Sequence, residues 1–330
     1  MAPLRARVFA GIACAALAAA GCSSASSSTG STPSGTANVA YAGSLTFLNE
    51  KLFGPAFHTA TGFSYQGQGA GSDALSQEIA AGTIFPNVFQ SVGGDPIMAL
   101  IPKFTHWYVR YAATSIVVAY NPNSKYAAQF KAIAAGTQPL KDLFTLMAKP
   151  GFKLGRTDPN IDPQGRSFIF MLELAQAKYH LPASILTTIL HGQPASANSP
   201  TIFSETALPS TLQSGQLDAS SAYLAQAIQL HLPYITLPAD INLGDFTLKD
   251  TYANASLTLT GGVIKTGKPI VFNVTVIGTK DRAAADAFVK YLLSPAGRAI
   301  YARGGYTLLT PAAFGDMAAI PGAIRRELGG

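Results

Sequence analysis

The chain has few residues suited to redox or metal chemistry. Only two cysteines occur among its 330 residues, Cys14 and Cys22, and both lie near the amino terminus. Neither a disulfide nor a thiolate metal site can therefore form within the part that follows residue 22. The five histidines show no His-Glu-x-x-His pattern and no close pairing typical of zinc sites. The sequence thus gives no support for a resident metal or a redox cofactor.

Charge is also scarce, at 12% of residues against 48% hydrophobic. The formal net charge of +6 includes Arg5 and Arg7, and the other basic residues are scattered without a Lys/Arg-rich block, so nucleic acid is not an expected partner. No Gly-Lys-Ser, Gly-Lys-Thr or Gly-x-Ser-x-Gly occurs, and the glycine run at residues 67–72 is Gly-x-Gly-x-Gly-Ser. These absences disfavour nucleotide binding and serine hydrolase chemistry.

The amino terminus has the pattern of an export signal. Arg5 and Arg7 precede an apolar run at residues 8–20, which is shorter than the roughly 20 residues that a membrane-spanning helix needs. The small residues before Cys22 resemble a bacterial lipoprotein signal, which predicts removal of residues 1–21 and lipidation of Cys22. A plain secretory signal is the alternative. Residues 22–37, rich in Ser, Thr, Gly and Pro, predict a flexible tether.

The folded part has a strand-loop-helix pattern that occurs twice at its start. Residues 39–42 predict a strand, and Gly43-Ser44 then leads into a helix that carries Leu48, Leu52 and Phe57. Residues 63–66 predict a second strand, followed after the glycine run by a helix at residues 73–81 that ends at Gly82. Ser44 and Ser72 each lie where a helix begins, and each could simply be an N-cap.

The middle of the chain predicts further strands and helices, and those after Pro122 predict a second α/β lobe. Residues 88–92 and 115–120 predict strands with helical patterns between them. Residues 191–204 are polar and rich in turn residues, which predicts a loop. The remaining expected elements are helices at residues 125–135, 140–148, 167–179 and 208–214, and strands at residues 153–155, 217–223 and 234–237.

Residues 155–165 join a strand to a helix and are the most distinctive loop of the chain. The two Asp-Pro steps hold the backbone extended, and Gly165 tolerates unusual backbone angles. The first-turn N–H groups of the following helix should face this loop, which predicts an anion-binding cradle. An ordinary strand-to-helix turn is the alternative.

Several blocks in fixed order resemble the tungstate/molybdate-binding proteins of ABC uptake systems. The resemblance covers residues 38–325. The parts that point to the tungstate/molybdate-binding proteins are the loop at residues 155–165, called the central loop below, and the Leu-Pro-x-x-Ile-Asn-Leu block at residues 237–243. The blocks lie at residues 104–111, 116–120, 155–165, 213–218, 234–243, 268–271 and 292–297.

The resemblance implies an α/β fold of the periplasmic-binding-protein type II, with two α/β lobes, a two-strand hinge and a ligand cleft. It places residues 38–120 with 265–330 in lobe 1 and residues 121–264 in lobe 2. It also implies a non-enzymatic, monomeric receptor without a cofactor, which is anchored to the membrane by lipid and delivers its ligand to an ABC transporter permease.

The resemblance further assigns a ligand site. Ser44 and Ser72 match hydroxyl and N–H donors of lobe 1, and in lobe 2 Gln164 matches a backbone N–H donor. Tyr223 matches a phenol donor. Asp162 and Glu205 match carboxylates that approach the metal of the oxyanion. Without the resemblance, both acids would be expected to interact with helix N-termini and Tyr223 to be a core aromatic.

Two carboxylates beside a dianion need a physical justification. They should repel a simple tetrahedral ion such as sulfate in a partly desolvated cleft. If tungsten or molybdenum expands from four oxygens to six ligands, the carboxylate oxygens become ligands, and repulsion becomes selectivity. In this chain Gln164 stands where relatives carry cysteine, Ile161 stands where they often carry a second acid, and residues 191–204 are shorter than the usual insertion.

Two other functions remain open at this point. A receptor for sulfate or another tetrahedral oxyanion follows if Glu205 points away from the cleft. An exported hydrolase that uses Asp162 and Glu205 as paired carboxylates is a remoter alternative. Arg156, Trp107 and Arg110 are left out of the site. The family that the chain resembles does not direct basic side chains at its ligand, and Trp-Tyr-x-Arg is typical of packing with a surface ion pair.

Overall fold

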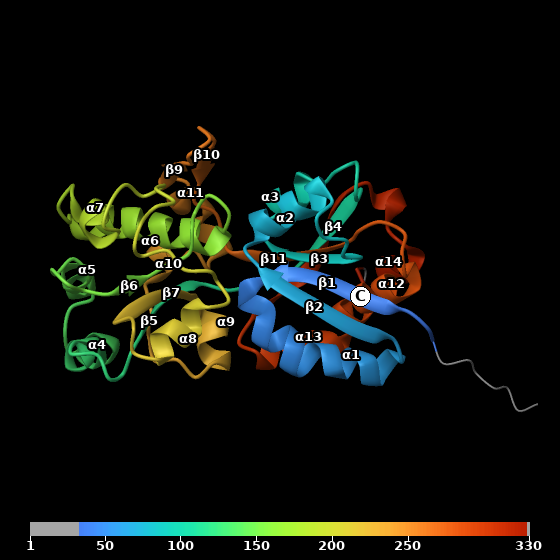
Figure 1. The fold of residues 1–330 in the computed structure, drawn as a ribbon, viewed down its shortest axis with the longest axis horizontal. Coiled ribbons are helices and arrows are strands. Elements are labelled where there is room, and N and C mark those ends of the chain that lie inside the picture. Colours follow the sequence, from blue (N-terminus) through green and yellow to red (C-terminus); the bar gives the residue numbers. More distant parts are fainter. Residues whose placement is uncertain (1–32, 329–330) are drawn as a thin grey trace, which may run out of the picture. The chain divides into compact units, whose positions relative to one another are not determined.

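The described part of this computed structural model, residues 33–328, contains two large β-sheets, each with helices on both faces (Figure 1), and a third, two-stranded sheet. The predicted signal peptide, Cys22 and most of the tether lie outside the described residues. Strand β1 (Thr36–Ala42) begins two residues before the predicted start of lobe 1. Within residues 33–328, every helix is too short or too polar to cross a membrane.

The first sheet has six strands, in the order β12-β4-β11-β3-β1-β2. Strand β1 is parallel to both of its neighbours, β2 (Ser64–Ala70) and β3 (Val88–Val92). Because Ala42 and Ala70 are paired, the turns that follow β1 and β2 emerge side by side. Ligands commonly bind beyond the carboxyl ends of such strands. The other strands are β4 (Trp107–Ala113), β11 (Val271–Val276) and β12 (Thr307–Gly315).

Alternating side chains of these strands pack into two apolar clusters. Val39 and Tyr41 belong to a cluster with Phe57 of α1 and Phe288 of α12, whereas Ala40 packs on the opposite face with Leu75 of α2. This alternation is the period of two expected of a strand that is covered on both faces. Figure 1 shows α2 and α3 on one face and α1 and α13 on the other. The bounds are α1 (Gly54–Thr61), α2 (Ser72–Ala81), α3 (Asp95–Met98), α12 (Arg282–Leu293) and α13 (Pro295–Arg303).

The second sheet has four strands, in the order β6-β7-β5-β8. Helix α6 (Pro163–Tyr179) lies over one face, and α8 (Leu208–Gln213) and α9 (Leu224–Gln229) lie over the other (Figure 1). The strands are β5 (Ile116–Tyr120), β6 (Leu154–Gly155), β7 (Ala219–Tyr223) and β8 (Tyr234–Ile235). The further helices and turns are η1 (Gly43–Leu45), η2 (Leu48–Phe53), α4 (Ala127–Ala134), α5 (Lys141–Met147), α7 (Ile185–Ile189), α10 (Ala239–Asn242), η3 (Phe246–Leu248), α11 (Lys249–Tyr252), η4 (Met317–Ala319) and α14 (Gly322–Arg326).

The chain passes between the sheets along two segments that meet. The N–H of Thr114 donates to the carbonyl of Ile270 over 3.2 Å, just before β5 and just before β11. Because β5 pairs with β7 and β8, the predicted end of the first part of lobe 1 at residue 120 is wrong, and lobe 2 begins at β5. The sequence pattern identified this strand correctly but could not show which sheet it joins.

A small hairpin precedes the return to the first sheet. Strands β9 (Ser256–Thr258) and β10 (Ile264–Thr266) pair with each other, and the N–H of Ser256 donates to Glu173 of α6 over 2.8 Å. This contact fixes the hairpin to lobe 2. Lobe 1 therefore resumes at β11 and not at residue 265.

Three further expectations are corrected. The region between β3 and β5 is not purely helical, because it contains β4, whose residues are buried on both faces and so show no alternation. Helix α6 begins at Pro163 instead of residue 167; proline fits a first turn because its missing N–H would have no helical partner there. Gly165 has no positive φ; a Cβ there would lie 2.4 Å from the carbonyl oxygen of Thr157.

Candidate functional site

The two serines that follow β1 and β2 are both buried. Ser44 is 2% exposed in η1, and Ser72 is fully buried at the first residue of α2. Neither side chain caps its helix, so the N-cap alternative is wrong. The Ser72 hydroxyl accepts a hydrogen bond from the N–H of Val92 over 3.0 Å and keeps its own proton free, while the Ser44 hydroxyl has no hydrogen-bond partner among the described residues.

Asp162 and Glu205 bring two carboxylates into the interior from lobe 2. Both are 3% exposed. Asp162 caps α6, its Oδ1 accepting the N–H of Gln164 over 2.8 Å, and Glu205 lies in the loop before α8 with Oε2 unpaired among the described residues. Burial raises the pKa of Asp162 from 3.8 to about 7. Burial, followed by the charge of Asp162, raises the pKa of Glu205 well above its ordinary value.

A glycine before each serine lets these carboxylates approach. A Cβ on Gly43 would lie 2.7 Å from Glu205 Oε2, and a Cβ on Gly71 would lie 3.3 Å from Asp162 Oδ2. Each Gly-Ser pair of lobe 1 therefore faces one carboxylate of lobe 2. The repeated Ala-Gly-Ser at residues 42–44 and 70–72 is a sequence signal for this arrangement.

Gln164 has a different role in the structure from the one assigned by resemblance. Its backbone N–H is directed at Asp162, as described above, and not at an open site. Its fully buried side-chain amide donates to Glu205 Oε1 over 3.2 Å and accepts a hydrogen bond from the Ser221 hydroxyl over 3.0 Å. Gln164 thus links the two acids and fixes the orientation of Glu205.

Tyr223 and Thr157 add two more hydroxyl groups. Tyr223 ends β7, is fully buried and has no hydrogen-bond partner for its hydroxyl within residues 33–328. Burial and the charges of Glu205 and Asp162 raise the pKa of Tyr223 well above 10, so the phenol keeps its proton. Thr157, which sequence reasoning missed, has a buried hydroxyl without a hydrogen-bond partner among the described residues.

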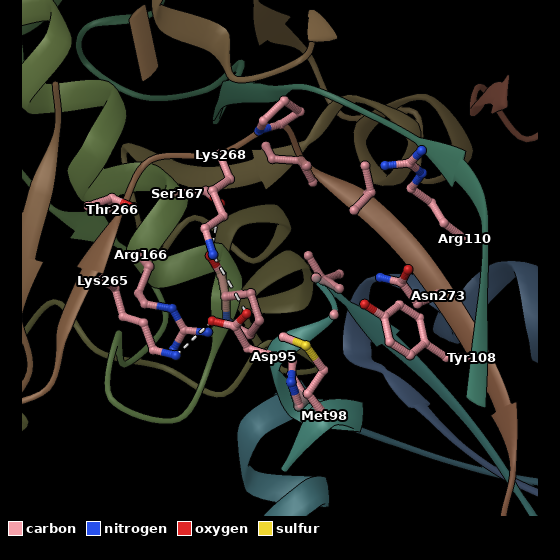
Figure 2. A pocket seen from close by; sticks show the side chains of 18 of the residues that line it. Asp95, Met98, Tyr108, Arg110, Arg166, Ser167, Lys265, Thr266, Lys268 and Asn273 are labelled. Carbon is pink, nitrogen blue, oxygen red and sulfur yellow. Dashed lines mark hydrogen bonds and ion pairs between the residues drawn. The ribbon is translucent and has the colours of Figure 1, made fainter. Parts of the chain in front are cut away.

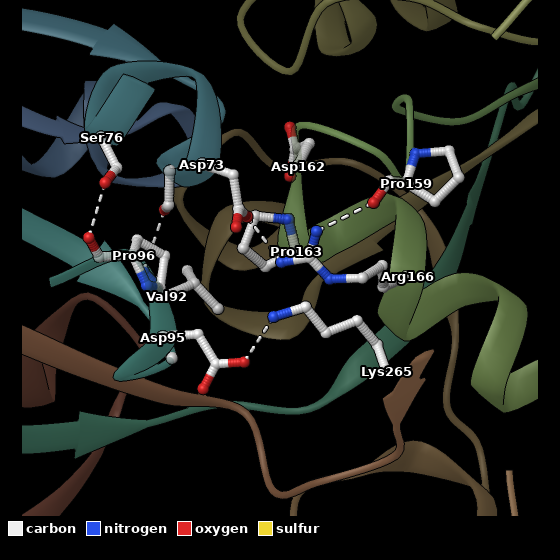
Figure 3. Close-up of polar contacts among 12 residues, drawn as sticks. Asp73, Ser76, Val92, Asp95, Pro96, Pro159, Asp162, Pro163, Arg166 and Lys265 are labelled. Carbon is white, nitrogen blue, oxygen red and sulfur yellow. Dashed lines mark hydrogen bonds and ion pairs between the residues drawn. The ribbon is translucent and has the colours of Figure 1, made fainter. Parts of the chain in front are cut away.

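The lobes are joined beside this site by an ion pair. Arg166 of α6 binds Asp73 of α2 over 2.6 Å, and it also donates to the carbonyl of Pro159 over 2.8 Å. Figure 3 shows the Arg166 guanidinium between these two partners, with Asp162 close by at the start of α6. Arg166 therefore neutralises Asp73 and partly offsets the charge of Asp162.

Arg156 is fully buried but contacts neither carboxylate. Its guanidinium donates to the Thr201 hydroxyl over 3.1 Å and to the Thr157 carbonyl over 3.2 Å, and burial lowers its pKa to about 10. It holds the shortened 191–204 segment against the central loop. Leaving Arg156 out of the predicted site agrees with these contacts.

The structure thus gathers every residue of the predicted site around two buried carboxylates. Serines and glycines come from lobe 1, and the acids, Gln164 and Tyr223 come from lobe 2. Within the described residues no group of three or more His, Cys, Asp or Glu side chains could hold a metal ion. Hydroxyl donors that lack partners, together with an unpaired carboxylate oxygen, leave hydrogen-bonding capacity that a small ligand with acceptor oxygens could satisfy.

Comparison with known proteins identifies the family. Residues 37–307 match the bacterial extracellular solute-binding proteins. The chain belongs to this family. The molybdate/tungstate-binding protein of Pyrococcus abyssi is 34% identical over 239 residues, which cover 66% of this chain and 67% of that one. The corresponding protein of Thermococcus kodakarensis is 34% identical over 238 residues, which cover 66% of this chain and 65% of its own length, just under two thirds.

Solved structures confirm the two-lobed fold. The periplasmic molybdate-binding protein of Azotobacter vinelandii has a TM-score of 0.57 at 18% identity, covering 82% of this chain and 99% of that one. The sulfate-binding protein SubI of Mycobacterium tuberculosis has a TM-score of 0.52 at 14% identity, covering 90% and 96%. The expected resemblance and the periplasmic-binding-protein-like fold are therefore both confirmed.

Proposed function

We propose that this solute-binding protein captures tungstate or molybdate between its lobes and delivers the oxyanion to an ABC transporter permease. The observation that carries the proposal is that two buried carboxylates, Asp162 and Glu205, lie in the same site as hydroxyl groups that have no hydrogen-bond partner among the described residues. Ser44, Ser72 and Tyr223 would donate hydrogen bonds to the oxo groups. The named binding of the two archaeal relatives supports the same ligand.

The two carboxylates argue against a site built only for sulfate. Both are buried, and within residues 33–328 Glu205 forms no ion pair with a basic side chain; its side-chain hydrogen bond comes from the neutral Gln164. A dianion that cannot accept further ligands would be repelled there. A metal centre that takes carboxylate oxygens as ligands removes the repulsion, so coordination by Asp162 and Glu205 supplies the selectivity.

The cellular setting is part of the proposal. Cleavage before Cys22 and lipidation of that cysteine would anchor the protein to the extracytoplasmic side of the membrane through a flexible tether. It would act as a monomer. It would need neither a cofactor nor catalytic residues, because it would bind and release its ligand unchanged. Replacing Cys22 with alanine should move the protein from the membrane fraction to the soluble extracytoplasmic fraction, which cell fractionation would measure.

Calorimetric titration tests the ligand and the site. We expect saturable binding of tungstate and molybdate at one site, with sulfate and phosphate excluded. Asp162→Asn and Glu205→Gln should each weaken tungstate binding by at least about a hundredfold, on the order of 3 kcal/mol, because each removes a ligand to the metal. Asp240→Asn, a change on the exposed surface of lobe 2, serves as the control.

Other outcomes would separate the alternatives. Equal binding of sulfate, with Glu205→Gln unaffected, would make this a general oxyanion receptor. Turnover of a glycoside that is lost in both variants would support the hydrolase. Failure of every anion to bind would contradict the proposal altogether.

A further inference from the structure

A second polar cavity of about 280 Å³ lies beside the carboxylate site. Its walls come from both lobes. Figure 2 shows Arg110, Asn273 and Tyr108 on one side, and Lys265, Lys268 and Arg166 on the other, with Asp95 between them. Neither Asp162 nor Glu205 is among the residues that line it.

Two buried donors in this cavity lack partners. Arg110 Nε and Asn273 Nδ2 are buried and make no hydrogen bond within residues 33–328. The two residues are opposite each other in the pairing of β4 with β11, so their side chains share one face of the sheet. A buried donor without an acceptor is destabilising because it has lost its hydrogen bonds to water, and an acceptor ligand bound here would restore that hydrogen bonding.

Arg110 is held in place by packing and not by an acid. Its guanidinium carbon lies 5.2 Å from the ring centre of Phe246 and 5.3 Å from that of Phe314. Among the described residues it takes part in no ion pair, so the surface ion pair expected from the sequence is wrong. Its charge is therefore preorganised and free to meet an anion.

The lining carries an excess of positive charge. Four basic residues face one acid, Asp95, which binds Lys265 over 2.8 Å and Lys268 over 3.7 Å. Burial alone would raise the pKa of Asp95, but the hydrogen bond from Lys265 and the charges of Lys268, Lys265 and Arg166 outweigh it and lower the pKa. Arg166 is already paired with Asp73, so Arg110 and part of the lysine pair remain uncompensated.

The cavity also adjoins the carboxylate site. It is lined by Pro163, which directly follows Asp162, and by Ser167 one turn further along α6. Val92 lines it as well, and the N–H of Val92 donates to the Ser72 hydroxyl of the inner site. An anion held there lies close to the inner site, but the lining presents basic groups in place of Asp162 and Glu205. The cavity therefore attracts any small dianion by charge, whereas the inner site demands metal coordination.

We propose that this cavity is an outer anion-binding site that takes small tetrahedral dianions, including those that the inner carboxylates exclude, and from which the receptor's own oxyanion enters. The entry step rests on the proposed function. The outer site itself does not, because its binding chemistry requires only charge and hydrogen bonds.

Selenate is the probe, because it is a tetrahedral dianion like sulfate and its selenium gives anomalous X-ray scattering. Crystals of the protein soaked in selenate should show an anomalous peak between Arg110, Asn273 and Lys268. In calorimetry, Lys268→Gln should weaken selenate binding about tenfold by removing one charge, and Asp95→Asn should strengthen it by freeing both lysines. Lys131→Gln on the exposed face of α4 should change nothing.

The side chain of Lys268 is 65% exposed, so its replacement should leave the fold intact, which a thermal melt would verify. Absence of a peak in the cavity would overturn the proposal. So would equal selenate affinities in the wild type, Lys268→Gln and Asp95→Asn, since a peak without these differences would be binding at crystal concentration only. Failure of tungstate to bind would contradict the proposed function but leave the selenate result standing.

Discussion

At the scale of single residues, the absence of a side chain at Gly43 is as important as the presence of one at Glu205. The lobe-2 carboxylate reaches the turn after β1 only because no Cβ stands in its way. Gly71 serves the same purpose for Asp162. Side chains that bind a ligand thus depend on a neighbouring backbone that permits close approach.

Gly43→Ala should therefore weaken oxyanion binding without unfolding the protein. The new Cβ would lie 2.7 Å from Glu205 Oε2, which forces the carboxylate or the lobe to move, whereas Gly43 has no positive φ that would add backbone strain. We expect a loss of about tenfold or more in tungstate affinity, about 1.4 kcal/mol, measured by calorimetry. Gly322→Ala, where nothing lies within 4 Å of the new Cβ, is the matched control. Unchanged affinity in Gly43→Ala would show that Glu205 has room to shift.

At the scale of elements, the sequence predicted many of the strands and helices up to residue 237, but none of those after it, and it did not predict how the lobes meet. Periodicity located β1, α2, β3 and β5 because their apolar patterns are local. It missed β4, whose burial on both faces hides the period of two. The partners of Gly43, Gly71 and Thr157 could not be predicted, because these contacts join residues far apart in the chain.

The site shows the same division. Family resemblance named Asp162 and Glu205, yet Gln164, which connects them through its backbone N–H and its side-chain amide, stands where relatives carry cysteine. A substitution of this kind changes contacts that only the folded chain displays. The hydroxyl of Thr157 and the cation-lined cavity near Arg110 likewise have no local sequence signature.

Two helices from different lobes are joined by the ion pair between Arg166 and Asp73. These side chains are 9% and 18% exposed, so the pair is shielded from solvent far better than a surface pair. Asp73→Ala would leave Arg166 buried without its acid in the closed arrangement. We expect the closed form to lose free energy and tungstate to dissociate about tenfold faster, as measured by stopped-flow chase with excess molybdate.

The matched control is the pair between Lys178 and Asp240, which joins α6 to α10 within lobe 2 and is more than a third exposed. Asp240→Asn should not alter the dissociation rate, because exposed pairs contribute little and this one does not span the lobes. Equal rates in Asp73→Ala and wild type would mean that the Arg166 pair does not hold the lobes together.

At the scale of the whole molecule, we expect lobe closure to be linked to protonation. Asp162 and Glu205 are buried in the described arrangement, and burial raises the pKa of each carboxyl. We expect opening of the lobes to expose both carboxyls to solvent and to return each pKa toward its ordinary value. Among the described residues, the other titratable groups that face this pair are Arg166, Asp73, Tyr223 and Tyr306. A raised pKa in the closed form means that closure without ligand is favoured at low pH and is progressively lost as pH rises.

For Asp162 the window runs from about pH 4, near its ordinary pKa, to about pH 7, and Glu205 extends it upward. Small-angle X-ray scattering of the ligand-free protein should therefore give a larger radius of gyration at pH 8 than at pH 5. Tungstate at pH 8 should restore the smaller value, because coordination replaces protonation as the way to bury the carboxylates. The double variant Asp162→Asn, Glu205→Gln should stay compact at both pH values without ligand. A wild-type radius that does not change between pH 5 and pH 8 would mean that burial of these two carboxyls does not control closure.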